Sequence, residues 1–190
     1  MSDTKNIMIV GVGGQGALLA SKTLGQVLMD AGYDVKVSEV HGMSQRGGSV
    51  VTYVRFGKKV YSPIIDKGEA DFIVSFELLE AARYAEYLKP NGKIVVNTQK
   101  MDPMPVLTGA AEYPADLVGE LKGKGFDVED LDCLSLANEA GSSKAVNIVL
   151  MGRLSKFMDF PESSWLTAIE KLVKPAFLEI NKKAFALGRK

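Results

Sequence analysis

The residues with the clearest chemical potential form a glycine-rich loop near the start of the chain. The run from Gly11 to Gly16 (Gly-Val-Gly-Gly-Gln-Gly) follows an apolar stretch, Ile7–Val10, and precedes a segment with helical spacing. In such a strand–GxGxxG–helix arrangement, backbone N–H groups at the helix N-terminus face an anion such as a phosphate. Glu39, near the end of the next apolar stretch, is placed to bind a ribose hydroxyl.

A second glycine-rich segment, His41–Gly48, contains the other candidate for anion binding. Arg46 stands between polar residues and a glycine pair, where its planar guanidinium can clamp a phosphate or carboxylate with two hydrogen bonds. An exposed loop arginine that pairs with a local carboxylate is the alternative. His41 is either a pH-responsive group or, as is more common for a lone loop histidine, a structural one.

The glycine pattern alone leaves two interpretations open. It can bind a phosphate or nucleotide, or it can merely allow a close turn between strand and helix. A nicotinamide dehydrogenase is poorly supported, because we find no Tyr-xxx-Lys pair and no catalytic His–carboxylate pair. We therefore predict no catalytic residue and no metal ligand. The predicted cofactor-binding residues are Gly11, Gly13, Gly14, Gln15, Gly16, Arg46, Gly47 and Gly48.

Three further residues are chemically notable. Glu77 follows a buried strand at the edge where α/β folds bind ligands, but an acid in the first turn of a helix more often meets the helix dipole. Asn147 lies within a predicted helix, where asparagine is unfavourable, so we expect a specific hydrogen bond. Cys133, in an apolar context, is expected to be a small buried hydrophobe.

The elements that position these residues follow from periodicity and punctuation. Strands are predicted at 7–10, 34–40, 49–56, 60–61, 72–76, 93–97 and within 126–133. Helices are predicted at 17–31, 77–88, from 114 to about 123, at 142–157, and in two further segments that begin near Pro161 and Pro175. The segment 98–114, with three prolines, is expected to be irregular, and residues 90–92 to form a turn.

These elements predict an α/β fold with three α/β/α layers and a Rossmann-like, mixed but mainly parallel sheet. Strands 7–10 and 34–40 should form a parallel pair across a right-handed crossover. Strands 49–56 and 60–61 should form one antiparallel hairpin. We expect residues 1–190 to make a single domain, with helices from about residue 135 onward.

Composition excludes several functions. The 23 basic and 23 acidic residues cancel, so no bulk field recruits nucleic acid or an anionic membrane. One cysteine excludes an internal disulfide and an iron–sulfur cluster held by this chain alone, and one histidine disfavours zinc. A polar start and the absence of a long apolar run predict a cytoplasmic protein without signal peptide or membrane span.

Four motifs, in this order, resemble one known family. They are the run Gly11–Gly16 followed by Ala20-Ser21-Lys22, the loop ending Gln45-Arg46-Gly47-Gly48 before Val50-Val51, the run Phe76–Ala81, and the run Asn147–Gly152. The chain is similar over nearly its whole length to the gamma subunit or domain of 2-oxoacid:ferredoxin oxidoreductases. The His41–Gly48 form is closest to the beta subunit of indolepyruvate:ferredoxin oxidoreductase.

The resemblance implies an accessory subunit that is inactive alone. Such an enzyme decarboxylates a 2-oxoacid, here an indolepyruvate or other aryl-pyruvate, forms acyl-CoA and CO2, and reduces ferredoxin. Thiamine diphosphate and 4Fe-4S clusters are expected on a large partner subunit in a hetero-oligomer, and coenzyme A to be contacted by this chain. A stand-alone nucleotide-dependent oxidoreductase and a non-enzymatic nucleotide-binding scaffold stay open as alternatives.

Overall fold

The structure is a computed structural model that describes residues 4–42 and 47–190. Its described strands form a single sheet in the order β2-β3-β1-β4-β5-β6. The strands are β1 (Lys5–Val12), β2 (Asp34–His41), β3 (Ser49–Gly57), β4 (Ala70–Ser75), β5 (Leu88–Asn97) and β6 (Asp127–Leu131). The sheet is mixed, as predicted, because β3 runs against all the other strands.

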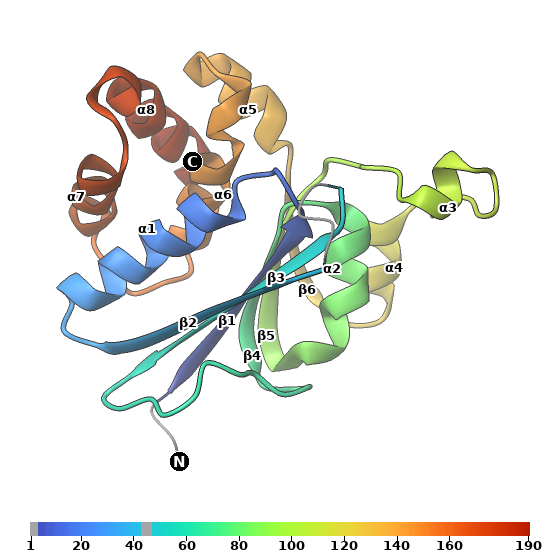
Figure 1. The fold of residues 1–190 in the computed structure, drawn as a ribbon, viewed down its shortest axis with the longest axis horizontal. Helices are drawn as coiled ribbons and strands as arrows, with labels where there is room; N and C mark the ends of the chain where they lie inside the picture. Colours follow the sequence, from blue (N-terminus) through green and yellow to red (C-terminus); the bar gives the residue numbers. More distant parts are fainter. Residues whose placement is uncertain (1–3, 43–46) are drawn as a thin grey trace.

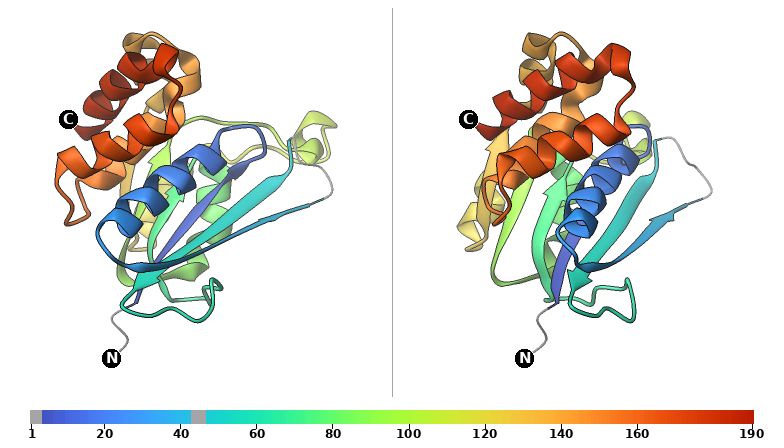
Figure 2. Two further views of the ribbon diagram at one scale, coloured as in Figure 1. Left: turned by 60° about the vertical axis from the view of Figure 1, so that its left-hand side comes forward. Right: turned by 90° about the vertical axis from the view of Figure 1, so that its left-hand side faces the viewer.

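Helices cover both faces of this sheet, which confirms the three-layer prediction (Figures 1 and 2). One face carries α1 (Ala17–Asp30), α5 (Cys133–Ala140), α6 (Val146–Ser155), α7 (Glu162–Leu172) and α8 (Leu178–Arg189). The other carries α2 (Leu78–Tyr84) and α4 (Leu117–Gly123). The short α3 (Met104–Leu107) stands away from both layers, and 3-10 turns η1 (Ala85–Tyr87), η2 (Ser143–Ala145) and η3 (Pro175–Phe177) complete the chain.

The central strand β1 supplies side chains to both cores. Ile7 and Ile9 are fully buried against the α1 and α6 side, whereas Met8 and Val10 are fully buried against the α2 side. Alternate residues of a strand point to opposite faces, so an unbroken apolar run is needed where both faces are covered. This is why the glycine loop, which follows β1 directly, starts from a rigid position.

The predicted parallel pairing of the first two strands is wrong. β1 and β2 point the same way, but β3 lies between them and pairs antiparallel with each. β3 bonds along β1 from Lys5↔Phe56 to Val12↔Ser49, and along β2 from Asp34↔Gly57 to His41↔Val50. The long β3, rich in β-branched residues, takes the position beside β1 and displaces β2 to the edge of the sheet.

The predicted hairpin exists with a different partner strand. We expected residues 49–56 to pair with 60–61, but Val60 and Tyr61 form no strand, and the second arm of the hairpin is β2. Both edges of β3 are already occupied by β1 and β2. The N–H of Val60 instead donates to the Asp34 carboxylate at 2.9 Å.

Several predicted element ends shift because of capping groups and a bulge. The helix predicted at 77–88 is divided into α2 and the 3-10 turn η1. The turn predicted at 90–92 lies inside β5, where Asn91 has φ 63° and the pairing with β4 shifts register. The helix expected from 114 begins at Leu117 because Asp116 caps it through the Gly119 N–H at 2.8 Å. The predicted helix 142–157 is divided into η2 and α6, and the irregular segment 98–114 contains α3.

The terminal helix α8 packs against α6 through two glycines. A Cβ on Gly188 would lie 2.0 Å from the Val149 carbonyl oxygen, and one on Gly152 would lie 2.2 Å from the Phe185 carbonyl oxygen. Only hydrogen fits at these positions, so the two backbones touch directly. Along the described parts of the chain, each helix is too short or too polar to cross a bilayer.

Candidate functional site

The glycine loop joins β1 to α1 and leaves the start of this helix uncapped. Gly16 adopts a left-handed conformation (φ 91°), and no side chain caps the first turn of α1. The Leu19 N–H donates back to the Gly16 carbonyl at 3.1 Å, and the N–H groups of Ala17 and Leu18 before it are available to an external acceptor. Gly14 also has positive φ, and a Cβ built on it would meet no atom within 4 Å. The space beside Gly14 is therefore open to a ligand.

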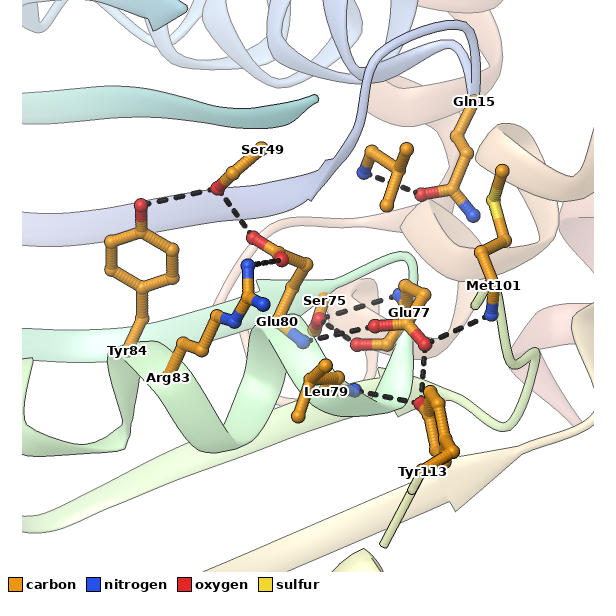
Figure 3. A network of polar contacts seen from close by, with 11 residues as sticks. Gln15, Ser49, Ser75, Glu77, Leu79, Glu80, Arg83, Tyr84, Met101 and Tyr113 are labelled. Carbon is orange, nitrogen blue, oxygen red and sulfur yellow. Dashed lines mark hydrogen bonds and ion pairs between the residues drawn. The ribbon is translucent and has the colours of Figure 1, made fainter. Parts of the chain in front are cut away.

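Two residues predicted to bind the cofactor, Gly11 and Gln15, also shape the loop, and their predicted binding remains a prediction. The Gln15 side chain folds back, accepting the Val12 N–H through Oε1 at 2.7 Å and donating from Nε2 to the Phe76 carbonyl at 3.1 Å (Figure 3). A Cβ on Gly11 would lie 2.8 Å from Cβ of Phe76. Gln15 thus ties the loop to the end of β4, and Gly11 permits the close approach.

The structure brings the second glycine-rich segment against the first. The Gly13 N–H donates to the Gly48 carbonyl at 2.8 Å, and the Gly47 N–H donates to the Gly13 carbonyl at 3.3 Å. Gly13 therefore contacts Gly47 and Gly48 directly, and the cofactor binding predicted for the three residues remains a prediction. Arg46 lies outside the described residues, so its predicted role remains a prediction.

The glycine loop forms a ridge between two clefts. The first cleft, of about 360 Å³, opens toward β2 and β3 and includes Gly14, Leu18, Glu39 and His41. Both residues predicted for chemistry on β2, Glu39 and His41, therefore reach the loop. An ionised Glu39 repels a phosphate, so this side suits a hydroxyl or a cation better than an anion.

The second cleft, of about 670 Å³, lies on the other side of the ridge. It is lined by the loop together with Gln99 and Met101 after β5, Leu134 on α5, and Ser143 and Lys144 on η2. Lys144 is exposed and has no ion pair among residues 4–42 and 47–190. The helix-start residues Ala17 and Leu18 line the first cleft, whereas the second holds this unpaired cation beside the backbone of the glycine loop. The positive charge makes the second cleft the better anion site.

Sequence reasoning did not single out Lys144, Gln99 or Met101. Lys144 lies 128 positions after Gly16, where the glycine loop ends, and a contact between α6 and the loop helps to bring it there. That contact is the hydrogen bond from Asn147 Nδ2 to the Gly16 carbonyl at 3.3 Å. The specific hydrogen bond predicted for Asn147 is thereby confirmed. An asparagine inside a predicted helix was the feature of the sequence that indicated a contact of this region with another part of the chain.

A network of buried polar groups is joined to the second cleft through Met101, one of its lining residues (Figure 3). Glu77 is 1% exposed and caps α2 by accepting the Glu80 N–H at 3.0 Å, so its predicted role at the helix start is confirmed. Its other oxygen accepts the Met101 N–H at 3.1 Å and the Tyr113 hydroxyl. Burial, followed by the hydrogen bond to Glu77, raises the pKa of Tyr113 well above its usual range, so this hydroxyl stays a donor.

A second buried carboxylate, Glu80, connects α2 to the start of β3. It accepts hydrogen bonds from Ser49 Oγ at 2.5 Å and from Arg83 at 2.9 Å (Figure 3). Burial raises the pKa of Glu80 above its ordinary value, although Ser49 and Arg83 act against this shift. Glu80 therefore anchors the strand that follows the His41–Gly48 loop.

The lone cysteine belongs to the core, as predicted. Cys133 is 0% exposed, and burial raises its pKa to about 12. A neutral buried thiol is a poor nucleophile and a poor metal ligand. Among residues 4–42 and 47–190, no group of three or more His, Cys, Asp or Glu side chains is placed to hold a metal ion.

The fold and the sequence together define the class of protein. The family model described as "Pyruvate ferredoxin/flavodoxin oxidoreductase" matches residues 6–190, and the chain belongs to this family. Among curated proteins it is 45% identical to "Indolepyruvate oxidoreductase subunit IorB" of Thermococcus kodakarensis, over 97% of this chain and 94% of that protein. It is 25% identical to the "Pyruvate/ketoisovalerate oxidoreductases common subunit gamma" of Pyrococcus furiosus, over 88% of this chain and 83% of that protein.

Solved structures share the fold. The pyruvate oxidoreductase subunit PORC of Thermotoga maritima matches with a TM-score of 0.76 at 22% identity, over 99% of this chain and 96% of that chain. The 2-oxoglutarate:ferredoxin oxidoreductase of Magnetococcus marinus, solved with 2-oxoglutarate, coenzyme A and succinyl-CoA, matches with a TM-score of 0.75 at 20% identity. It covers 100% of this chain but 31% of that longer chain. These comparisons do not favour a stand-alone dehydrogenase or a scaffold.

Proposed function

We propose that the chain is the small subunit of a 2-oxoacid:ferredoxin oxidoreductase that acts on indolepyruvate or a related aryl-pyruvate. The observation that carries this proposal is the 45% identity to an indolepyruvate oxidoreductase subunit across 97% of this chain and 94% of the relative. The identity to the subunit shared by pyruvate and ketoisovalerate enzymes is 25%. The aryl substrate is thus favoured over a small aliphatic one.

The electron-transfer chemistry belongs to a larger partner subunit. A 4Fe-4S cluster needs about four ligands, and this chain has one cysteine, which is buried. We place thiamine diphosphate and the iron–sulfur clusters on the partner subunit. Ferredoxin then interacts with the assembled complex and not with this chain alone. The hetero-oligomer is expected in the cytoplasm and has no role for nucleic acid or a membrane.

The part we assign to this chain is a contact with coenzyme A in the second cleft. The fit rests on three features of that cleft: the glycine-loop backbone in its lining, open space beside Gly14, and the unpaired Lys144. Coenzyme A supplies the thiol that accepts the acyl group, and its phosphates match these donors. Gly14 and Gly16 offer their backbone, Gly13 holds the segment 47–48 against the loop, and Gln15 holds the loop in shape. We also assign to Arg46, in the segment His41–Gly48, a contact between its guanidinium and coenzyme A.

Reconstitution with the larger subunit tests the function. The two chains are co-expressed, and reduction of ferredoxin is followed with indolepyruvate and coenzyme A. We expect turnover that requires both subunits and coenzyme A, with indolepyruvate preferred over pyruvate and 2-oxoglutarate by kcat/KM. Turnover by the larger subunit alone at the same rate, or equal preference for the three acids, contradicts the proposal.

A further inference from the structure

A projecting arm, residues 98–116 between β5 and α4, is the feature that the site does not explain. No residue of this arm is buried, and its helix α3 stands clear of the sheet layers (Figure 1). Met104 and Leu107 at its tip are 67% and 66% exposed. From Pro103 to Ala111 the arm carries no charged residue. An exposed segment without charge is unusual on a protein surface and indicates a contact with another apolar surface.

The tip has defined internal structure. The N–H groups of Ala110 and Ala111 donate to the Pro105 carbonyl at 2.8 and 3.0 Å, and the Thr108 N–H donates to the Met104 carbonyl at 2.9 Å. Two prolines restrict the backbone further. A preorganised tip loses little conformational entropy when it binds, which favours a role in docking.

Both stems of the arm are fastened to one buried carboxylate. Glu77 accepts the Met101 N–H from the outgoing stem and the Tyr113 hydroxyl from the returning stem (Figure 3). The Tyr113 oxygen also accepts the Leu79 N–H at 3.1 Å, and the Gln99 carbonyl accepts the Leu78 N–H at 3.1 Å. The arm is therefore held in a fixed direction relative to α2. Its root, at Gln99 and Met101, forms one wall of the second cleft.

We propose that the arm docks this chain onto the larger subunit, with Met104 and Leu107 inserted into an apolar pocket of that partner. This inference rests on the proposed function. In the Magnetococcus marinus enzyme, the same fold makes up 31% of a longer chain and is covalently joined to the rest of it. The Thermococcus kodakarensis relative, matched over 94% of its length, is named as a subunit, and a separate subunit associates with its partners through surface contacts.

A second copy of this chain is a poorer occupant than the larger subunit. Stable interfaces bury at least about 1,200 Å² in total, far more than two side chains on a narrow tip provide. Such a tip suits the role of a binding hot spot within a wider interface. Docking beside the second cleft would also bring the partner's reactive centre next to the assigned coenzyme A contact.

A photocrosslink from the tip tests the contact. Cys133 is buried and its thiol pKa is raised, so a maleimide–benzophenone label reacts selectively with Leu107→Cys. Tyr61→Cys, 89% exposed in the loop after β3 at the opposite end of the strands from the arm, is the matched control. We expect the tip label to crosslink to the larger subunit in the irradiated complex and the control label not to. Equal crosslinking from both positions overturns the proposal.

An affinity measurement completes the test. The double variant Met104→Asp/Leu107→Asp should bind the larger subunit at least about tenfold more weakly, whereas Tyr61→Asp should bind normally. Both tip side chains are exposed, so the melting temperature of the isolated variant should match wild type. Unchanged affinity of the tip variant for the larger subunit overturns the proposed role of the arm. So does a variant that loses self-association of this chain but still binds the larger subunit. Neither result affects the proposed function. A wild-type chain that does not bind the larger subunit refutes both.

Discussion

Asn147 reaches across from α6 and donates its side-chain N–H to the Gly16 carbonyl at 3.3 Å. Its Nδ2 atom also lies 2.8 Å from where a Cβ on Gly16 would stand. The residue that ends the glycine loop is therefore restricted twice, by its left-handed backbone and by the amide packed against it. This pair determines where α1 begins relative to the C-terminal helices.

Gly16→Ala should destabilise the chain more than Gly14→Ala. Both residues have positive φ, so each substitution strains the backbone by about 1 kcal/mol or more. Only Gly16 faces a neighbour, whereas nothing lies within 4 Å of a Cβ on Gly14. Urea unfolding of the two variants measures the difference. Equal free energies of unfolding would show that Asn147 moves aside without cost.

Tyr113→Phe should loosen the arm and lower stability by about 1–3 kcal/mol. The change removes one donor to the buried Glu77 carboxylate and leaves the Leu79 N–H without its acceptor. We expect faster amide hydrogen exchange at Met101 and through the tip of the arm. Tyr61→Phe, at an exposed position far from Glu77, serves as the control. Unaltered exchange in the arm of Tyr113→Phe would show that Glu77 does not hold it.

Glu80 should give stability a pH dependence of a defined sign. Because burial raises its pKa in the folded chain, the folded state holds the proton more tightly than the unfolded state. Its contribution to stability is then greatest below the ordinary glutamate pKa and falls as pH rises through the raised value. The difference in unfolding free energy between wild type and Glu80→Gln isolates this effect. A difference that favours wild type increasingly as pH rises contradicts the assignment.

The Cys133 thiol should be unreactive in the folded chain. It is 0% exposed and its pKa is raised to about 12, so little thiolate forms at pH 8. Titration with a disulfide reagent should give no rapid reaction in native buffer and one thiol per chain in guanidinium. Rapid labelling of the native chain would place Cys133 near the surface instead.

Lys144→Ala should raise the KM for coenzyme A in the assembled enzyme by about tenfold while kcat changes little, since a lost ground-state contact acts on binding. Lys174→Ala, an exposed lysine outside the second cleft, is the control. Arg46→Ala is expected to act in the same direction. If it leaves the KM unchanged, Arg46 is not part of the site.

Local patterns predicted most elements and the outline of the site. The run Ile7–Val10 and the glycines after it identify β1, its loop and α1, because these features are encoded within a few residues. The position of β3 was not predictable in the same way. Either β2 or β3 has the composition to lie beside β1, and the choice depends on pairing between segments far apart in sequence.

The site shows the same division. The contact of Gly13 with Gly47 and Gly48 joins two motifs that were recognisable by composition. Lys144 carried no local signal, because an exposed lysine after a helix cap is ordinary until the fold places it in a cleft. The clamp of Met101 and Tyr113 on Glu77 likewise depends on tertiary structure that periodicity does not reveal.

The paired backbone bonds between Gly13 and the segment 47–48 have a mechanical consequence. They join the loop before α1 to the residues before β3, which pairs with β2, so we expect a displacement of one segment to be transmitted to the other. We expect a ligand bound at the start of α1 to displace β2, the outermost strand of the sheet, as well. Binding of a ligand at the glycine loop should then be detectable as a structural change at β2, which lies at the edge of the sheet.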